Sequence, residues 1–486
     1  MARALAWQSP DVEVEAERAV RAARAVDGWP LGAALVGAPV AALAAWIWHD
    51  LDASPALILA ALFVGAVVPF LVVETWRHGV TSPAVLFVVG LAYYHVVIPI
   101  EYLVDPNLPR SFLYEYGMVS ARDLVTPLVA TDAALLAFLV GYAYTRRRGP
   151  AAEYVIDPKR LTRFAAIFAA VGIAMYLTMS LVATGSLFGI FNASYRDRDE
   201  LFFGLGSLGV GLQLVYLGAS ALGILWLSRR GLLGMIGAVA ILALMGLHTF
   251  LVGSKMHVFH VGIAVLVGAR VAGWRIRASA LLLVAVLLIP LLFVGLTRNR
   301  LGQGVEEMAE FAADEADAES FNPANLDAYG PYLTLIYTTA NLRVPADLKW
   351  GGTYLQILTL MPPRWMYPGR PTPIADEFAM EFLGKDYYDN AGFGYSSVTE
   401  AYVNFGAVGP PLVFVLIGLG FGALRDALER RRGQLAAAIV YATGAPWILL
   451  TLRYPLSGVA KGYGLMMLVP TLALVWLGRR RGEVVG

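Results

Sequence analysis

Residues 392–424 read GFGYSSVTEAYVNFGAVGPPLVFVLIGLGFGAL and mark the point where a long polar segment returns to an apolar one. The first half, up to Gly406, mixes glycines, aromatic rings, hydroxyls and one carboxylate, Glu400. The second half is apolar and of the length that crosses a bilayer core about 30 Å thick. Similar apolar segments fill most of the chain, so the segment between Thr297 and Phe405 is its one long interruption.

The composition is typical of a polytopic membrane protein. Of the 486 residues 58% are hydrophobic and only 15% are charged, with a mean hydropathy of +0.63, whereas soluble proteins carry about 25% charged residues. The net charge of +1 argues against a nucleic-acid partner. Cysteine is absent, which excludes disulfides, thiolate metal sites and cysteine nucleophiles, and we expect no metal or other cofactor.

The hydrophobic pattern predicts an all-α polytopic fold with about 12 transmembrane helices and one large extracytoplasmic loop containing short helices. The expected spans are 31–48, 55–75, 83–104, 127–144, 161–183, 207–227, 232–251, 256–271, 278–296, 406–424, 434–452 and 462–477. Four regions follow: a cytosolic amphipathic segment (1–30), the first nine helices (31–297), the external loop (298–405), and the last three helices with a basic cytosolic tail (406–486).

The distribution of basic residues sets the expected orientation. With the N-terminus in the cytosol, the cytosolic connections carry most of the arginines, whereas the first external connection, 49–54, has acids and no Lys or Arg. The cytosolic set includes Arg77, Arg146, Arg147, Arg148, Lys159, Arg160, Arg163, Arg229, Arg230, Arg270, Arg275, Arg277, Arg425, Arg430, Arg431, Arg432, Arg479, Arg480 and Arg481. Both termini are therefore expected on the cytosolic side of the membrane, with the long loop outside, in a periplasm-like or other extracytoplasmic space.

Some basic residues lie in expected external positions, against this rule, so an interaction at those positions should stabilise them. Arg298 and Arg300 stand where the ninth expected span meets the loop, and Arg196, Lys255 and Arg453 stand in short external connections. Binding of an anionic substrate would explain why these basic residues lie on the external side, because guanidinium groups bind phosphate oxygens with two parallel hydrogen bonds. Alternatively, each basic residue pairs with a nearby acid or with a lipid phosphate.

The loop contains three contrasting segments before its end. Residues 305–319 hold seven acids, a pattern more typical of a solvated helix face than of a metal site. Residues 329–342 are apolar and aromatic but too short to span, which favours a packed or interfacial helix. Residues 354–371 combine helix-breaking prolines with Arg364 and Arg370, which are further candidates for binding the substrate.

The end of the loop carries the most chemistry. Gly394 allows close backbone approach, and Glu400 lies four residues after Ser396, so both face one side of a helix. Tyr402 and Phe405 offer rings that can stack on a sugar. Glu400 can act as general base toward a sugar hydroxyl; alternatively, it pairs with an arginine and holds the helix. The candidate substrate-binding residues of this cluster are Gly394, Tyr395, Ser396 and Tyr402.

Two stretches carry a resemblance to a known family. LTLMPPRWMYPGRP (358–371) and GFGYSSVTEAYVNFGAVGPPLVFVLIGLGFG (392–422) resemble the Wzy-type O-antigen or oligosaccharide repeat-unit polymerases. That family is also similar in span count, in its single large external loop and in the basic residues of its external loops. Its members join undecaprenyl-diphosphate-linked oligosaccharides outside the inner membrane. The resemblance therefore implies the same kind of donor and acceptor for this chain. Membrane lipids and a chain-length regulator protein are the other partners that it implies.

The resemblance also implies roles for particular residues. It places an arginine-based diphosphate site at Arg298 and Arg300, and a glycine–serine–glutamate element at Gly394, Ser396 and Glu400. The arginines would stabilise the negative charge that builds on the leaving diphosphate, and the carboxylate would orient or deprotonate the acceptor hydroxyl. Direct displacement of this kind needs no metal and inverts the anomeric centre.

Other functions stay open. The arginine–ten-residue–glycine spacing of some family members is missing, because Ser207 stands where Arg196 would need a glycine. O-antigen ligases share the general plan but place a histidine in the large loop, and no histidine follows His260 here, which favours a polymerase. A polysaccharide or lipid transporter is the alternative from another class. Coupled transport favours ionisable groups near mid-membrane, and the main carboxylates expected in spans, Asp132 and Glu101, lie near external ends.

Overall fold

A computed structural model describes residues 29–48, 54–104, 123–145, 155–187, 210–228, 263–264, 266–268, 270, 329–342, 347–360, 362, 366–383, 394–431 and 433–479. These residues are almost entirely helical and contain no strand, only one isolated backbone bridge between Ile156 and Arg479. Six helices among them are long and apolar enough to cross a membrane. The predicted all-α membrane fold is therefore confirmed for the described part, whereas about 12 spans stays a prediction.

The helices before the loop follow the expected spans closely. They are α2 (Trp29–Trp48), α3 (Pro55–His78), α4 (Pro83–His95), α5 (Val97–Val104), α7 (Val125–Tyr144), α8 (Pro158–Thr184) and α10 (Val210–Ser228). The third expected span is divided into α4 and α5, because the backbone leaves the helical conformation at Val96 (φ −126°). The expected spans 232–251 and 278–296, and most of 256–271, lie outside the described residues.

The loop forms short helices, as predicted. They are α15 (Tyr329–Asn341), α16 (Gly352–Leu360), α17 (Ile374–Phe378) with a π-helical continuation, η4 (Ala379–Leu383), and α19 (Ser397–Phe405). The apolar segment 329–342 is indeed a packed helix, since Tyr332, Leu333 and Leu335 are buried. Helix α16 ends just before the proline-rich stretch, as expected of helix-breaking residues.

The last part of the chain forms two long apolar helices and one shorter one. A single 3₁₀ turn, η5 (Gly406–Val408), joins α19 to α20 (Gly409–Arg430), and α21 (Leu435–Leu450) follows. The last helix is continuous from Leu456 to Gly478 but changes its winding: α22 (Leu456–Val459), the π-helix η6 (Ala460–Leu468) and α23 (Val469–Gly478). Helix α20 begins three residues later than expected because Gly406 adopts a positive φ of 62°.

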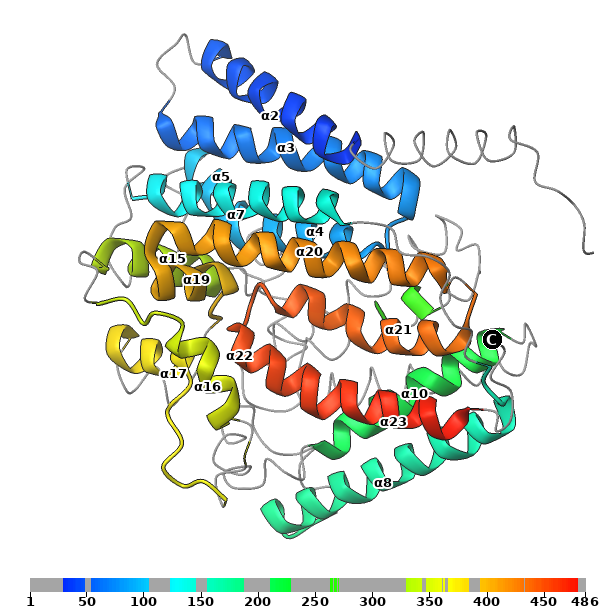
Figure 1. Cartoon of the computed structure of the whole chain (residues 1–486). Coiled ribbons are helices and arrows are strands. Elements are labelled where there is room, and N and C mark those ends of the chain that lie inside the picture. Colours follow the sequence, from blue (N-terminus) through cyan, green and yellow to red (C-terminus); the bar gives the residue numbers. More distant parts are fainter. Residues whose placement is uncertain are drawn as a thin grey trace, which may run out of the picture.

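The long helices lie roughly side by side, and the short loop helices gather at one end of the bundle (Figure 1). Helices α15, α16, α17, α19 and α22 occupy the left-hand end in that view, and the C-terminal ends of α20 and α23 lie at the other. At that second end, the start of α8 meets the end of α23, since Asp157 N–H donates to Gly478 O over 2.9 Å. We call these the loop end and the basic end.

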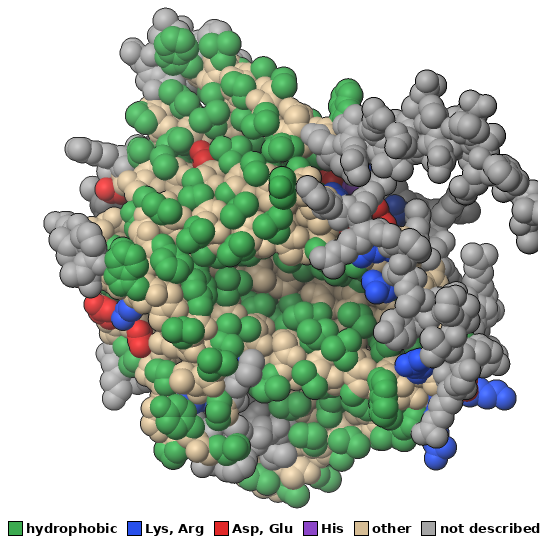
Figure 2. Space-filling model, viewed as in Figure 1, with side chains coloured by type: hydrophobic (Ala, Val, Ile, Leu, Met, Phe, Trp, Pro, Cys, Tyr) green, Lys and Arg blue, Asp and Glu red, His purple; other side chains and the backbone are tan. Residues whose placement is uncertain are grey.

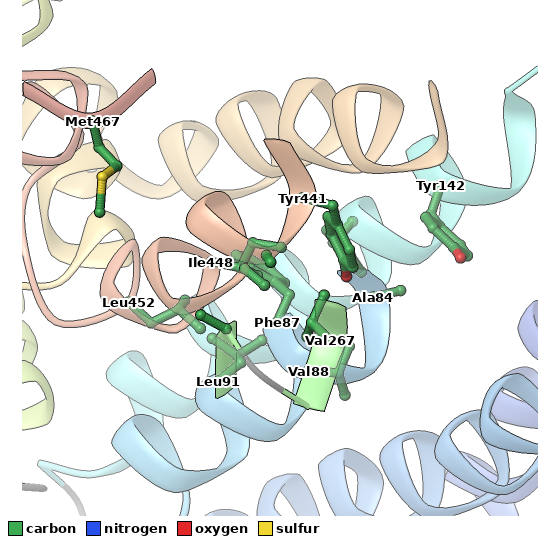
Figure 3. Packing of buried hydrophobic residues seen from close by; sticks show 14 of the residues in the cluster. Ala84, Phe87, Val88, Leu91, Tyr142, Val267, Tyr441, Ile448, Leu452 and Met467 are labelled. Atoms are coloured by element: carbon green, nitrogen blue, oxygen red, sulfur yellow. The ribbon is translucent and has the colours of Figure 1, made fainter. Parts of the chain in front are cut away.

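The core is built from aromatic and small side chains. Phe87 on α4 stacks on Phe138 on α7, with ring centroids 4.4 Å apart. Figure 3 shows Phe87 and Leu91 of α4 beside Ile448 of α21 and Leu452, which lies just after the end of that helix. All of these side chains are buried, so α4 is held between α7 and α21 at the centre of the described bundle.

The surface divides into an apolar belt and a charged end. Large apolar side chains such as Val68 on α3, Val140 on α7 and Leu416 on α20 are exposed, and Figure 2 shows such residues covering the middle of this face. Lys and Arg side chains on the same face collect mainly at the basic end (Figure 2). This separation is expected of a chain whose middle zone contacts lipid.

One sequence-based expectation needs correction. Asp132 and Glu101 are not the only important carboxylates in the expected spans, because Glu74 on α3 is fully buried and accepts hydrogen bonds from Ser82 (2.6 Å) and Tyr142 (2.5 Å). A buried pair, Arg425 and Asp426, lies near it, with Arg425 4.5 Å from the Tyr142 ring centroid. Helix α3, which carries Glu74, and helix α20, which carries Arg425 and Asp426, both run beyond their expected ends. These charges therefore lie near the basic end, where neighbouring polar groups can satisfy them.

The orientation can be tested because the chain has no native cysteine. We predict that a cysteine at Met366, which is 61% exposed in the loop, reacts with a membrane-impermeant maleimide in spheroplasts. A cysteine at Arg163, which is exposed at the start of α8, should react only after permeabilisation, since basic residues favour the cytosolic side. Labelling of both from the same side would contradict the orientation.

Candidate functional site at the loop end

Glu400 is positioned by a well-defined helix start. Ser396 is the N-cap of α19: its Oγ accepts a hydrogen bond from Thr399 N–H over 3.0 Å. Glu400 N–H donates to Ser396 O over 2.9 Å, so the predicted four-residue relation between Ser396 and Glu400 is confirmed. Ser396 and Glu400 are both fully buried.

The Glu400 carboxylate joins three helices. Thr353 on α16 donates to Oε1 over 2.9 Å, and Leu456 N–H, at the start of α22, donates to Oε2 over 2.5 Å. No ion pair of Glu400 occurs among the described residues. The arginine partner considered as an alternative is therefore not found there, and a hydroxyl and a backbone amide bind the carboxylate instead. A negative charge at the first turn of the last helix also interacts favourably with that helix's dipole.

Asn404 completes the cluster one turn later on α19. Its Nδ2 donates to Thr353 Oγ1 over 2.6 Å and to the Glu400 carbonyl over 2.7 Å. The segment before α16 is fixed by backbone bonds to the same helix, Lys349 N–H to Val403 O and Trp350 N–H to Asn404 O, each 3.1 Å. The positive φ of Trp350 (46°) lies in this connection, where several backbone contacts hold a strained residue in place.

The connection after α21 is held against the same helix start. Tyr395 N–H donates to Arg453 O over 2.8 Å, which puts the backbone of Arg453 beside the N-terminus of α19. The half-buried guanidinium of Arg453 lies 5.8 Å from the Tyr454 ring centroid. Burial, and then the nearby Glu400 charge, raise the pKa of the Tyr395 phenol well above its usual value, so Tyr395 is a neutral group that hydrogen-bonds with the Thr338 side chain.

Two glycines permit this packing. A Cβ on Gly394 would lie 2.8 Å from Pro331 Cδ at the start of α15, and one on Gly409 would lie 1.9 Å from Ala401 O. The absence of a side chain at Gly394 lets α15 approach the segment before α19, and its absence at Gly409 lets α19 fold back on α20. The predicted role of Gly394 in close backbone approach is therefore confirmed.

The other predicted site residues have different fates. Tyr402 is half-buried against the core, and the Phe405 ring stacks on Tyr354 of α16, with centroids 6.2 Å apart. Arg370 is half-buried in a turn, and its backbone N–H donates to Tyr367 O. The remaining predicted residues, Arg196, Lys255, Arg298, Arg300 and Arg364, lie outside the described residues, as does the acidic segment 305–319.

Sequence reasoning missed Thr353 and did not place Asp132 beside the loop helices. Thr353 is 2% exposed and binds both Glu400 and Asn404, yet nothing in its local sequence marks it. Asp132 on α7 faces α15: burial, and then the Asp132 charge, raise the pKa of Tyr332. Neither carboxylate oxygen of Asp132 has a hydrogen-bond partner among the described residues, so a second buried polar group lies beside the loop helices.

Comparisons with models of protein families, with characterised proteins and with solved structures found no match to this chain.

The contacts of Thr353 give a stability prediction. Thr353→Val keeps the shape of the side chain but removes the hydrogen bond to Glu400, leaving a buried carboxylate oxygen unsatisfied at a cost of about 1–3 kcal/mol. We expect a melting temperature several degrees lower for the purified protein in detergent. Thr353→Ser keeps the hydroxyl and serves as the control; equal melting temperatures for the two variants would contradict the assignment.

Proposed function

We propose that this chain is a membrane glycosyltransferase that polymerises undecaprenyl-diphosphate-linked oligosaccharide repeat units on the external face of the inner membrane. The observation that carries the proposal is the cluster around Glu400. It joins loop helices α16 and α19 to the start of the last membrane helix, at the loop end of the bundle (Figure 1). A site there would meet a lipid-linked substrate at the membrane surface.

In the proposed reaction, the acceptor hydroxyl oxygen attacks the anomeric carbon of the donor, and the bond from that carbon to the diphosphate breaks. The hydroxyl proton leaves to a base or to water, and the configuration at the anomeric carbon inverts. Negative charge accumulates on the departing diphosphate, so several guanidinium groups would lower the barrier. Arg453, Arg298 and Arg300 are the proposed diphosphate ligands, and the position of the Arg453 backbone beside α19 supports its inclusion.

Glu400 suits a positioning role in this scheme. Its side chain is fully buried, and each oxygen already accepts a hydrogen bond. To act as general base it would have to exchange one of these donors for the acceptor hydroxyl, whereas it fixes α16, α19 and α22 without any rearrangement. The general-base role stays a prediction, and the Glu400→Gln variant distinguishes it from the positioning role.

A reconstituted assay tests the function directly. Purified protein in liposomes is supplied with lipid-diphosphate repeat units, and products are separated by length. We expect a ladder of polymers; transfer of a single glycan to another acceptor would indicate a ligase, and absence of any reaction would contradict the glycosyltransferase proposal.

In the same assay, Arg298→Ala and Arg300→Ala should abolish polymer, and Arg453→Ala should weaken its formation. Removing a charge that acts on the leaving diphosphate lowers turnover more than donor binding. Lysine at these positions should rescue poorly, because it lacks the two-pronged geometry. Arg163→Ala, at the basic end, is the matched control. Wild-type turnover in the Arg298 and Arg300 variants would refute the diphosphate site.

Glu400→Gln separates positioning from base catalysis. Glutamine can accept from Leu456 N–H and donate to Thr353, so a positioning role predicts turnover within about tenfold of wild type together with a lower melting temperature. A general base predicts a loss of about two to four decades with an intact fold, and loss of the acidic limb of the pH–rate profile. The readouts are single-turnover rates across pH and thermal unfolding of the same preparation.

The Glu74 cluster favours transport as a second candidate function. Glu74 of α3 is buried against α7 near the basic end, and His78 Nδ1 lies 2.5 Å from Glu429 Oε1 in the same region. Ionisable groups buried within membrane helices often serve proton-coupled transport. Flipping of a fluorescent lipid-diphosphate glycan across proteoliposomes, lost in Glu74→Gln and absent from empty liposomes, would support this alternative.

A further inference from the structure

A long groove runs between α20, α21 and the last helix. Its volume is about 610 Å³, and Figure 2 shows this face hollowed between α20 and α23. Its lining is mainly apolar and aromatic, with Leu428, Val440, Trp447, Tyr463 and Trp476 among the side chains. A groove of this lining on the membrane-facing side of a bundle is suited to a hydrocarbon chain rather than to a polar solute.

The groove extends along most of α21. Its lining on that helix begins at Ala436 and reaches Thr451 just beyond the helix end, which at about 1.5 Å per residue is a length of roughly 22 Å. That is most of the hydrocarbon thickness of a bilayer, about 30 Å. The groove therefore offers room for an extended acyl chain lying along the membrane normal.

The charges of the groove are all at one end. Among its described lining residues, the charged ones are Arg431, just after α20, and Arg479, just after α23. Both belong to the basic end, whereas Thr451 and Val459 line the end near the loop helices. Two guanidinium groups at the mouth of an apolar groove match the chemistry of a phosphate headgroup joined to a hydrocarbon tail.

We propose that this groove binds an anionic glycerophospholipid, with the phosphate on Arg431 and Arg479 and one acyl chain along α21. The position of the two arginines favours a phospholipid over the lipid-diphosphate donor. A donor that reacts beside Glu400 would carry its diphosphate at the loop end, whereas these arginines stand at the opposite end of α21. The exclusion of the donor rests on the proposed function, whereas the match to an anionic phospholipid rests on the groove and its two arginines.

The test uses delipidated full-length protein in detergent, titrated with phosphatidylglycerol or phosphatidylcholine of the same acyl chains. Bound lipid is counted by native mass spectrometry, and unfolding temperature is measured in parallel. We expect one tightly held phosphatidylglycerol and a higher melting temperature with that lipid than with phosphatidylcholine. Changing both Arg431 and Arg479 to Gln should weaken phosphatidylglycerol binding about tenfold or more and leave phosphatidylcholine unaffected.

Two further variants locate the bound lipid. Arg163→Gln removes an exposed arginine at the same end that does not line the groove, and it should bind as wild type. Val440→Trp fills the middle of the groove and should lose the lipid while keeping both arginines. If that variant does not fold, the double arginine variant, altered only at half-buried positions, still decides the proposal.

Several results would overturn it. Equal binding of the two lipids, or unchanged binding in the double variant, would mean that the groove has no headgroup site. Displacement of phosphatidylglycerol by undecaprenyl phosphate at equal concentration would assign the groove to the tail of an isoprenoid lipid. Dimerisation that is lost in Val440→Trp would assign it to a second copy of the chain.

Discussion

The loop end depends on one buried carboxylate. Burying an ionised Glu400 completely costs several kcal/mol, and two hydrogen bonds to a charged group, worth about 1.5–3 kcal/mol each, can offset that cost. Because one donor is on α16 and the other is the first amide of the last helix, the carboxylate is satisfied only when loop and membrane helices are in register. The carboxylate thereby adds a specific polar connection to the apolar packing of loop helix α15, whose Tyr332 and Leu333 are buried against Leu128 of α7.

A second buried carboxylate holds the basic end in a similar way. Glu74 binds the hydroxyls of Ser82 and Tyr142, and so links α3, the start of α4 and α7. Arg425 lies over the Tyr142 ring and adds α20. Between the two ends the helices are held by apolar packing and by close backbone approach at small residues, since a Cβ on Gly141 of α7 would lie 2.2 Å from Val415 O of α20. The hydrogen bonds at both ends add further contacts that only one arrangement of the helices satisfies.

Local features were predictable from the sequence, and long-range contacts were not. The apolar windows gave α3, α7 and α8 within a few residues, and the proline spacing gave the end of α16. Thr353 lies 47 residues from Glu400 in the chain, and Tyr142 lies 68 residues from Glu74. No residue pattern marks such pairs. Glu74 was overlooked because a hydropathy window of bilayer length averages one carboxylate among many apolar neighbours.

The last helix connects the two proposed sites. Its first amide binds Glu400, its π-helical segment brings Tyr463 against α21, and its end carries Arg479. A Cβ on Gly444 would lie 2.5 Å from Tyr463 Oη, so α21 and this segment are in close contact beside the groove. π-Helical turns are often found at functional sites. A lipid in the groove would therefore contact the same helix whose start completes the Glu400 cluster.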